Sequence, residues 1–349
     1  MNKISDMLKK KIPLFYTLSL FLATNVFYLL ILQQQRKLNN DDAAVELAQE
    51  QNHSGSDYCN YRLVRLQGYR YIHPLMFFDN DCESSELATV KSKIENVIND
   101  FKRQGQLSNA SVYLRSFNSA EWIAIDGDLK YSPGSLMKVP ALMTFLKMNE
   151  RKPGLLDQRV VYDKPIPDGR NINFQSKGIE LGKSYTIREL LQYMITYSDN
   201  KATLLLGKYL DVDLFKKLFA DLGLRAPEFN ELQFKVSPKE YSLFFRLLYN
   251  ASYLSRQDSE WCLELLNTCN FKDGIVAGLP PQINVSHKFG EAGYDNSPEL
   301  SESGIIFMNN NPYLLTVMTN GNDMKKLPGA ISKISAVVYD QMSSIRDKM

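Results

Sequence analysis

The chain has 349 residues, of which 44% are hydrophobic and 23% charged, and its formal net charge is +2. This is the composition of an ordinary globular protein, and it excludes a disordered or fibrous chain. Lysine and arginine are scattered among aspartate and glutamate instead of forming a block, so no nucleic-acid partner is expected. The length is sufficient for more than one compact lobe.

The N-terminal segment has the pattern of a transmembrane helix. Residues 12–35 contain no charged side chain, and residues 13–32 are almost continuously apolar, which is long enough to cross a bilayer core of about 30 Å. Lys9, Lys10 and Lys11 precede this run. Such a basic cluster predicts a single-pass protein of the cell membrane whose remainder lies on the extracytoplasmic side. A cleaved signal peptide and a buried core helix are the alternatives, although no small-x-small cleavage motif follows directly.

The composition divides the chain into three regions. We predict a cytoplasmic stub and transmembrane anchor in residues 1–36, a spacer and membrane-proximal β segment in residues 37–84, and the main domain in residues 85–349. Cys59 and Cys82 can pair across a hairpin if this part is exported, or they remain two free buried thiols. None of the four cysteines has CxxC spacing, so neither a metal nor another cofactor is predicted.

Helical and strand patterns follow a definite order in the main domain. Apolar positions at helical spacing from Ser85 to Gln104 predict a helix that Ser84 or Ser85 can cap, and Thr186 is predicted to cap another. Strands are predicted at 111–117, 121–126, 283–288, 304–308 and 313–319, a mostly helical region at 131–270, and a closing helix at 329–345. This order predicts an α/β fold of the α+β type. An antiparallel sheet built from both chain ends is flanked by helices, and the helical insert forms a second lobe with a cleft at the junction.

The first candidate for chemistry is the four-residue motif from Ser135 to Lys138. A serine hydroxyl needs a base to become a nucleophile near neutral pH. In the first turns of a helix, residues three apart share a face, so the Lys138 amine can reach the Ser135 oxygen. A buried lysine near other cations can be neutral and act as that base. The same spacing also occurs by chance on solvated helices, so the pair by itself is a weak signal.

The second candidate is Ser198-Asp199-Asn200, which lies between two apolar helical runs. The Ser198 hydroxyl can shuttle a proton between a lysine and a leaving group. The Asn200 amide can hold a substrate carbonyl and a lysine ammonium together. An ordinary connection between two helices is the alternative, because these residue types are common there.

The third candidate is the segment from His287 to Glu291, which closes a predicted strand. Lys288 can attract an anionic group of a substrate if it faces the cleft. Gly290 lets a substrate backbone approach, and the backbone N–H of Glu291 can serve as an oxyanion donor. His287 is expected to be structural. The alternative for the whole segment is an exposed strand end with a glycine turn.

In this order, the three motifs resemble the SxxK, SDN and KTG set of class A β-lactamases and penicillin-binding proteins. The resemblance covers about residues 86–349, and the triple match is specific although no single motif is. It implies that Ser135 is the acylated nucleophile and that Lys138 activates it. It implies further that Ser198 is the proton shuttle, that the Asn200 amide binds the substrate carbonyl, and that Lys288 meets the substrate carboxylate.

The sequence departs from the family pattern at two places, one that bears on substrate binding and one that bears on deacylation of the acyl-enzyme. Phe289 follows Lys288 where the family typically has Thr or Ser, and its ring either adds bulk at the strand edge or turns into the core. Class A enzymes also carry a deacylating Glu in an ExxLN motif. Neither Glu228 nor Glu231 in the segment 225–233 fits that motif, and either carboxylate can equally be a cap or a solvent-exposed group.

The predicted activity is hydrolysis of a β-lactam amide through Ser135 by a membrane-anchored serine hydrolase. The first alternative is a D,D-peptidase that acts on peptidoglycan stem peptides, which the anchor and the missing ExxLN motif favour. The second is a catalytically silent, membrane-tethered domain that binds cell-wall peptides or another envelope protein, which Phe289 favours. The expected partners are therefore a β-lactam or a peptidoglycan peptide, and the membrane through the N-terminal helix.

Overall fold

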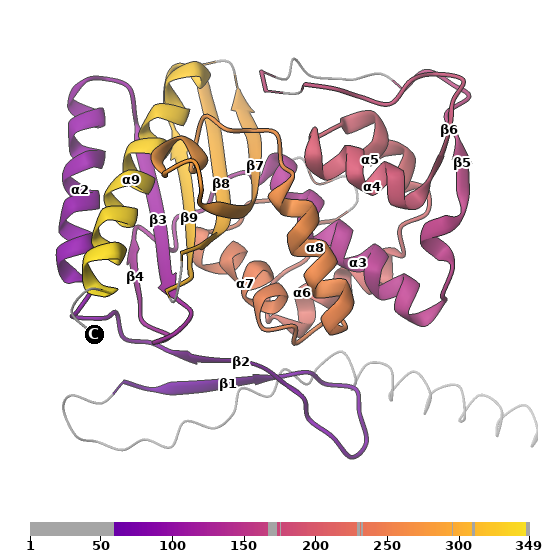
Figure 1. Cartoon of the computed structure of the whole chain (residues 1–349), viewed down its shortest axis with the longest axis horizontal. Coiled ribbons are helices and arrows are strands. Elements are labelled where there is room, and N and C mark those ends of the chain that lie inside the picture. Colours follow the sequence, from indigo (N-terminus) through magenta and orange to yellow (C-terminus); the bar gives the residue numbers. More distant parts are fainter. Residues whose placement is uncertain are drawn as a thin grey trace, which may run out of the picture. The chain divides into compact units, whose positions relative to one another are not determined.

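A five-stranded antiparallel sheet forms the centre of the fold (Figure 1). The computed structural model describes residues 59–166, 173–174, 176–228, 231, 233–294, 296–308 and 311–346. In sheet order the strands are β4 (Trp122–Ile125), β3 (Asn109–Ser116), β9 (Tyr313–Asn320), β8 (Ser297–Phe307) and β7 (Asn284–Tyr294). All neighbours pair antiparallel. The prediction of an antiparallel sheet built from both ends of the chain is confirmed, and β7 is an edge strand.

Strand β8 begins seven residues before the predicted start at residue 304, at Ser297. Its first half reads as polar, but Ser301, Glu302 and Ser303 are fully buried. Two of the three have hydrogen-bond partners on neighbouring strands. The Ser303 hydroxyl lies 2.7 Å from that of Thr316 on β9, and the Glu302 carboxylate lies 2.7 Å from His287 Nδ1 on β7. These hydrogen bonds offset the cost of burying Glu302 and Ser303.

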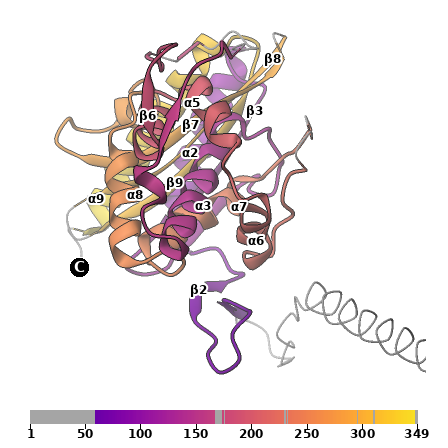
Figure 2. The ribbon, with the colours of Figure 1, turned by 90° about the vertical axis from the view of Figure 1, so that its right-hand side faces the viewer.

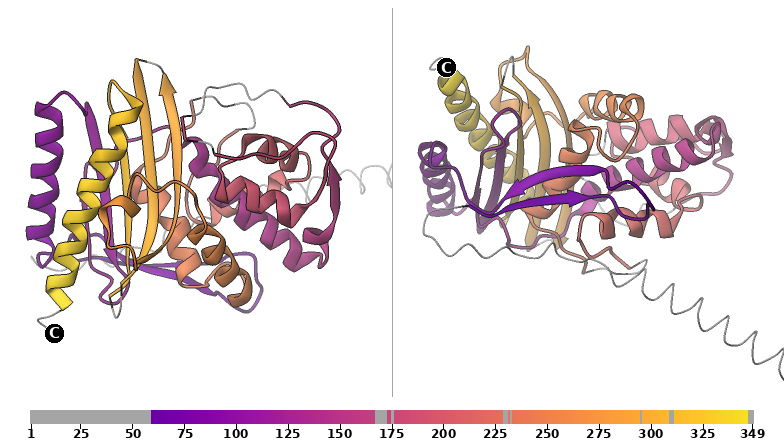
Figure 3. Two further views of the ribbon diagram at one scale, coloured as in Figure 1. Left: turned by 45° about the horizontal axis from the view of Figure 1, so that its top comes forward. Right: turned by 90° about the horizontal axis from the view of Figure 1, so that it is seen from below.

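Helices α2 (Ala88–Arg103) and α9 (Leu327–Arg346) cover one face of the sheet and pack against each other (Figures 1 and 3). The predicted cap of α2 was wrong. Leu87 occupies the N-cap position and makes no side-chain capping bond. The Ser84 hydroxyl instead donates to Glu121 at 2.9 Å, beside the start of β4.

The segment between β4 and β7 supplies the helices on the other side of the sheet (Figures 1 and 2). They are α3 (Lys138–Arg151), α4 (Ile187–Thr196), α5 (Asn200–Gly207), α6 (Val212–Asp221), α7 (Pro238–Tyr249) and α8 (Arg256–Asn267), with the strand pair β5 (Arg159–Val161) and β6 (Ser184–Thr186). Short 3₁₀ helices lie at η1 (Gly134–Met137), η2 (Leu155–Asp157), η3 (Val276–Gly278) and η4 (Met324–Lys326). Thr186 caps α4 as predicted, in a reciprocal capping box with Glu189.

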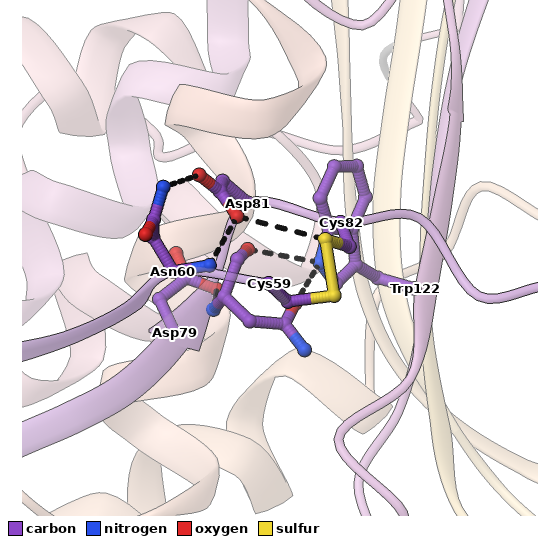
Figure 4. The surroundings of a disulfide bond; sticks show 7 residues. Cys59, Asn60, Asp79, Asp81, Cys82 and Trp122 are labelled. Carbon is purple, nitrogen blue, oxygen red and sulfur yellow. Dashed lines mark hydrogen bonds between the residues drawn. A yellow bond between two sulfur atoms is a disulfide. The ribbon is translucent and has the colours of Figure 1, made fainter. Parts of the chain in front are cut away.

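A β-hairpin of β1 (Tyr61–Arg65) and β2 (Leu75–Asn80) precedes the first helix. A disulfide between Cys59 and Cys82 closes its base (Figure 4), so these two thiols pair, whereas Cys262 and Cys269 are free and buried. The Trp122 indole donates to the Asn80 side chain at 2.6 Å. The Asp79 carboxylate accepts from Arg115 and Arg246, at 3.3 Å each. These contacts attach the hairpin to β3, β4 and α7.

The predicted anchor lies outside the described residues, as does the spacer up to residue 58. Within the part of the chain that the structure describes, no helix is both long and apolar enough to cross a membrane. Residues Asp57–Met349 group into one compact unit. The boundary between residues 84 and 85 stays a prediction.

Candidate active site

Ser135 lies on the short helix η1, and Lys138 is the first residue of α3. The predicted turn of helix is therefore 3₁₀ in kind, and in that geometry side chains three residues apart are eclipsed. Ser135 is half-buried and Lys138 is buried. The Tyr241 hydroxyl on α7 donates to the Leu136 carbonyl at 2.8 Å and fixes this turn from beneath.

Two glycines allow η1 and the edge strand β7 to touch through their backbones. A Cβ on Gly134, which has φ of 50°, would lie 2.2 Å from the Glu291 carbonyl oxygen. A Cβ on Gly290 would lie 2.3 Å from the Pro133 carbonyl oxygen. No larger residue fits either position without a backbone shift. Gly290 thus admits the nucleophile turn to β7, and its predicted role toward a substrate backbone stays a prediction.

The Lys138 amino group lies within hydrogen-bonding distance of three oxygen atoms of the second motif. Nζ donates to the Ser198 carbonyl at 2.6 Å, to the Ser198 hydroxyl at 3.0 Å and to Asn200 Oδ1 at 2.8 Å. Burial, followed by the nearby Lys288 charge, holds the pKa of Lys138 well below its usual range. A lowered pKa favours the neutral form of the lysine, which a general base requires.

Ser198 has an unusual backbone that aims two of its oxygens at Lys138. Its φ is 55°, in the left-handed region that non-glycine residues rarely adopt. The adjacent Asp199 holds this conformation, because its carboxylate accepts from the Lys201 backbone at 2.9 Å, where it caps α5, and from the Ile179 backbone at 2.8 Å. Burial raises the pKa of Asp199. An Asp that caps a helix is the signal in the sequence that points to this role of Asp199.

Lys288 on β7 approaches the same serine from the other side. Its Nζ donates to the Ser198 hydroxyl at 3.0 Å and to the Phe289 carbonyl at 2.9 Å, and its side chain is fully buried. Burial lowers the pKa of Lys288 to about 8. Ser198 therefore joins two lysines of lowered pKa, which suits a proton shuttle. The predicted contact of Lys288 with a substrate carboxylate stays a prediction.

The Phe289 ring turns into the core, so of the two predicted orientations the buried one is present. Its exposed fraction is 2%. The ring stacks on Phe271 at 4.4 Å between centroids and meets the edge of Phe174 at 6.2 Å. Sequence reasoning missed Phe174 and Phe271, because no local pattern connects them with the strand motif.

The Glu291 side chain binds a segment from the helical insert. Its carboxylate accepts from the Asn173 backbone and side chain at 2.9 Å each, and from the Phe174 backbone at 3.0 Å. No local pattern in the sequence indicates this contact between distant segments. The role of the Glu291 backbone N–H as an oxyanion donor stays a prediction.

His287 is structural, as expected. Its Nδ1 lies 2.7 Å from Glu302 on β8, and both side chains are fully buried. The second carboxylate oxygen of Glu302 accepts from the Ile275 backbone at 2.8 Å. Glu302 was missed because a carboxylate within a polar run gives no sign that it is buried.

The two candidate deacylating carboxylates are both paired with cations of the insert. Glu231 accepts two hydrogen bonds from the Arg225 guanidinium, at 2.7 Å each. Glu228 is exposed and accepts from Lys216 at 2.9 Å. Among the described residues, every hydrogen bond and ion pair recorded for these carboxylates stays within this segment or joins it to α6.

The sequence model of the β-lactamase enzyme family matches residues 89–342, more than half of the chain. No curated protein gives a match. Similar solved structures include PBP-A (20% identity, TM-score 0.61, 74% of this chain and 97% of that one). They also include a class A β-lactamase from Mycobacterium abscessus (20% identity, TM-score 0.61, 73% of this chain and 99% of that one). A β-lactamase from Burkholderia phymatum is similar as well (17% identity, TM-score 0.59, 74% of this chain and 100% of that one). Together with the family match, this common fold means that the chain belongs to the β-lactamase enzyme family, as a class A β-lactamase-like serine hydrolase.

Proposed function

We propose that Ser135 attacks the amide carbonyl of a β-lactam and forms an acyl-enzyme. The observation that carries this proposal is the hydrogen-bonded group of Lys138, Ser198 and Asn200 beside the nucleophile turn. The bond between Ser135 Oγ and the carbonyl carbon forms as the carbon–nitrogen bond breaks. The serine proton passes to neutral Lys138 and then, through Ser198, to the departing nitrogen. In the hydrolytic half, water attacks the acyl carbonyl and releases Ser135.

A second candidate is D,D-peptidase action on peptidoglycan stem peptides, and the pairing of two carboxylates favours it. Arg225 occupies both carboxylate oxygens of Glu231, and Lys216 occupies one of the two in Glu228, so these carboxylates are poorly placed to activate water. A β-lactam acyl-enzyme without such a base persists, which is the behaviour of a peptidase that penicillin inhibits. A variant of PBP-A, which shares the fold, is known as an acyl-enzyme complex with penicillin G.

The catalytic domain is proposed to lie on the extracytoplasmic side of the cell membrane, with residues 13–32 as its anchor. The basic cluster before this apolar run supports that orientation. The disulfide between Cys59 and Cys82 supports it independently, because disulfides persist in oxidising compartments.

Intact-mass measurement after prolonged incubation with excess fluorescent penicillin tests the proposal. We expect one adduct on the wild type and on the control Ser119→Ala, which removes an exposed turn hydroxyl, and none on Ser135→Ala. A lasting adduct identifies the peptidase, and rapid release with β-lactam turnover identifies the β-lactamase. A wild type that shows neither an adduct nor β-lactam turnover contradicts both and leaves the silent binding domain.

A further inference from the structure

The outward face of the β1–β2 hairpin is apolar. Leu63 on β1 lies directly opposite Phe78 on β2, and the Tyr61 ring stacks on Phe78 at 5.1 Å between centroids. All three side chains are exposed, Tyr61 by 67%. The Phe77 ring is turned to the domain instead, where it is buried with its centroid 4.4 Å from the Arg246 guanidinium. A sheet face in water usually carries polar side chains, so an apolar one indicates a partner.

The loop between the two strands adds to this surface. Tyr69, Tyr71 and Ile72 in the loop are exposed, Tyr71 by 82%, and so is Leu75 at the start of β2. We call these side chains, together with the three on the outward face, the hairpin patch. It holds more than half of the large apolar side chains that are exposed in the described part of the chain. Exposed apolar groups gathered in one place mark a contact with another molecule or with a membrane.

The charges that accompany the hairpin patch are basic. Arg65 and Arg70 are both exposed, and the Arg70 guanidinium lies 5.0 Å from the centroid of the Tyr71 ring. The Asp79 carboxylate, by contrast, is bound by two arginines of the domain. Tyrosine, arginine and aliphatic side chains together suit the headgroup layer of a bilayer. There the rings bury their apolar bodies, and the guanidinium meets lipid phosphates.

The chain itself keeps this surface near a membrane. The apolar run proposed as the anchor ends at residue 32, and the hairpin is closed at its base by the disulfide at Cys59. The connection of about 26 residues covers at most roughly 90 Å even when fully extended. The bilayer is therefore a tethered partner, for which a weak attraction is sufficient. A second copy of the chain or a wall glycan lacks this tether.

We propose that the hairpin patch lies in the headgroup layer of the membrane that holds the anchor and docks the catalytic domain there. This inference rests on the proposed anchor and is independent of the acylation of Ser135. The hairpin and α5, which begins at the site residue Asn200, lie on opposite sides of the domain (Figures 1 and 2). Docking therefore turns the start of α5 away from the bilayer and leaves the site open to its substrate.

Quenching of tryptophan fluorescence by brominated lipid tests this inference, because such lipids quench indole rings that touch the bilayer. The full-length chain is reconstituted in vesicles of phosphatidylglycerol and phosphatidylcholine, with or without bromine on the acyl chains. Tyr71→Trp places a reporter in the patch, and Leu204→Trp places one at an exposed position of α5. The wild type gives the background from Trp122 and Trp261. We expect Tyr71→Trp to lose at least a third of its added fluorescence, and Leu204→Trp less than a tenth.

Substitutions in the Tyr71→Trp chain show whether the patch causes the quenching. Leu63→Ser combined with Ile72→Ser removes two exposed apolar side chains of the patch and should at least halve the quenching. Val161→Ser combined with Leu181→Ser removes two side chains of similar exposure elsewhere and should leave the quenching unchanged. Thermal melting checks that both variants fold.

A charge reversal and an alkaline wash complete the test. Arg70→Glu should lower the quenching in the same direction if the serine variants fail to fold. Suppose that the chain stays in the vesicles after the wash, but Tyr71→Trp is quenched no more than Leu204→Trp. That result overturns the inference while the anchor stands, whether the patch then binds a second copy or a glycan. A chain that the wash removes overturns the proposed anchor, and this inference with it.

Discussion

At the scale of single residues, the surroundings of Lys138 limit the chemistry most directly. Its three hydrogen bonds end on Ser198 and Asn200, and burial depresses its pKa. Lys138→Met keeps an unbranched apolar stem but removes the base. We expect acylation of Ser135 to slow by about 100-fold or more, the usual range for loss of general base catalysis. Time courses of acylation by penicillin measure this effect.

The matched control is Lys147→Met on the same helix. Lys147 is half-buried, and its ammonium bonds to Glu150 and to the Tyr253 carbonyl, both at 2.7 Å. This variant should acylate at the wild-type rate, and thermal melting checks that both variants fold. Near wild-type acylation in Lys138→Met would refute the proposed activation route.

At the scale of elements, the site depends on contact between η1 and β7. Gly290→Ala places a Cβ against the Pro133 carbonyl oxygen, where no flexible side chain can yield. We expect a loss of about 1–3 kcal/mol in unfolding free energy, as for other overpacked positions, together with slower acylation because the nucleophile turn moves. Gly207→Ala, in open space at the end of α5, is the control and should preserve both. Equal behaviour of the two variants in urea unfolding would contradict this account.

Elements whose signals are local were predictable from the sequence. The Thr186 capping box and the five strands of the central sheet follow from short-range patterns. The early start of β8 could not be predicted, because Ser301–Ser303 read as polar and nothing local indicates that they are buried. For the site, the order of motifs gave the residues that meet around Ser198. The burial of Lys288 depends on Phe174 and Phe271 from elsewhere in the chain, which single motifs do not reveal.

At the scale of the whole molecule, the buried Lys288 links the stability of the fold to pH. Its pKa falls from 10.5 in its ordinary state to about 8 in the folded chain. Between these values the unfolded chain holds a proton that the folded chain has released, so stability rises with pH across this window. Lys288→Met removes this dependence. The stability of the wild type relative to the variant should therefore grow by about 2 kcal/mol from pH 7.5 to pH 9.5.

Urea unfolding of both proteins at the two pH values measures that difference, and subtraction cancels the groups they share. Lys138 remains in the variant, where burial still lowers its pKa, so the part of its contribution that comes from burial cancels as well. Lys272→Met, which removes an exposed lysine, is the control and should follow the wild type at both pH values. A difference that is flat or shrinks with pH would show that Lys288 stays protonated in the folded chain. Ser198 would then lie beside a cation at Lys288, and proton transfer through it would be confined to Lys138.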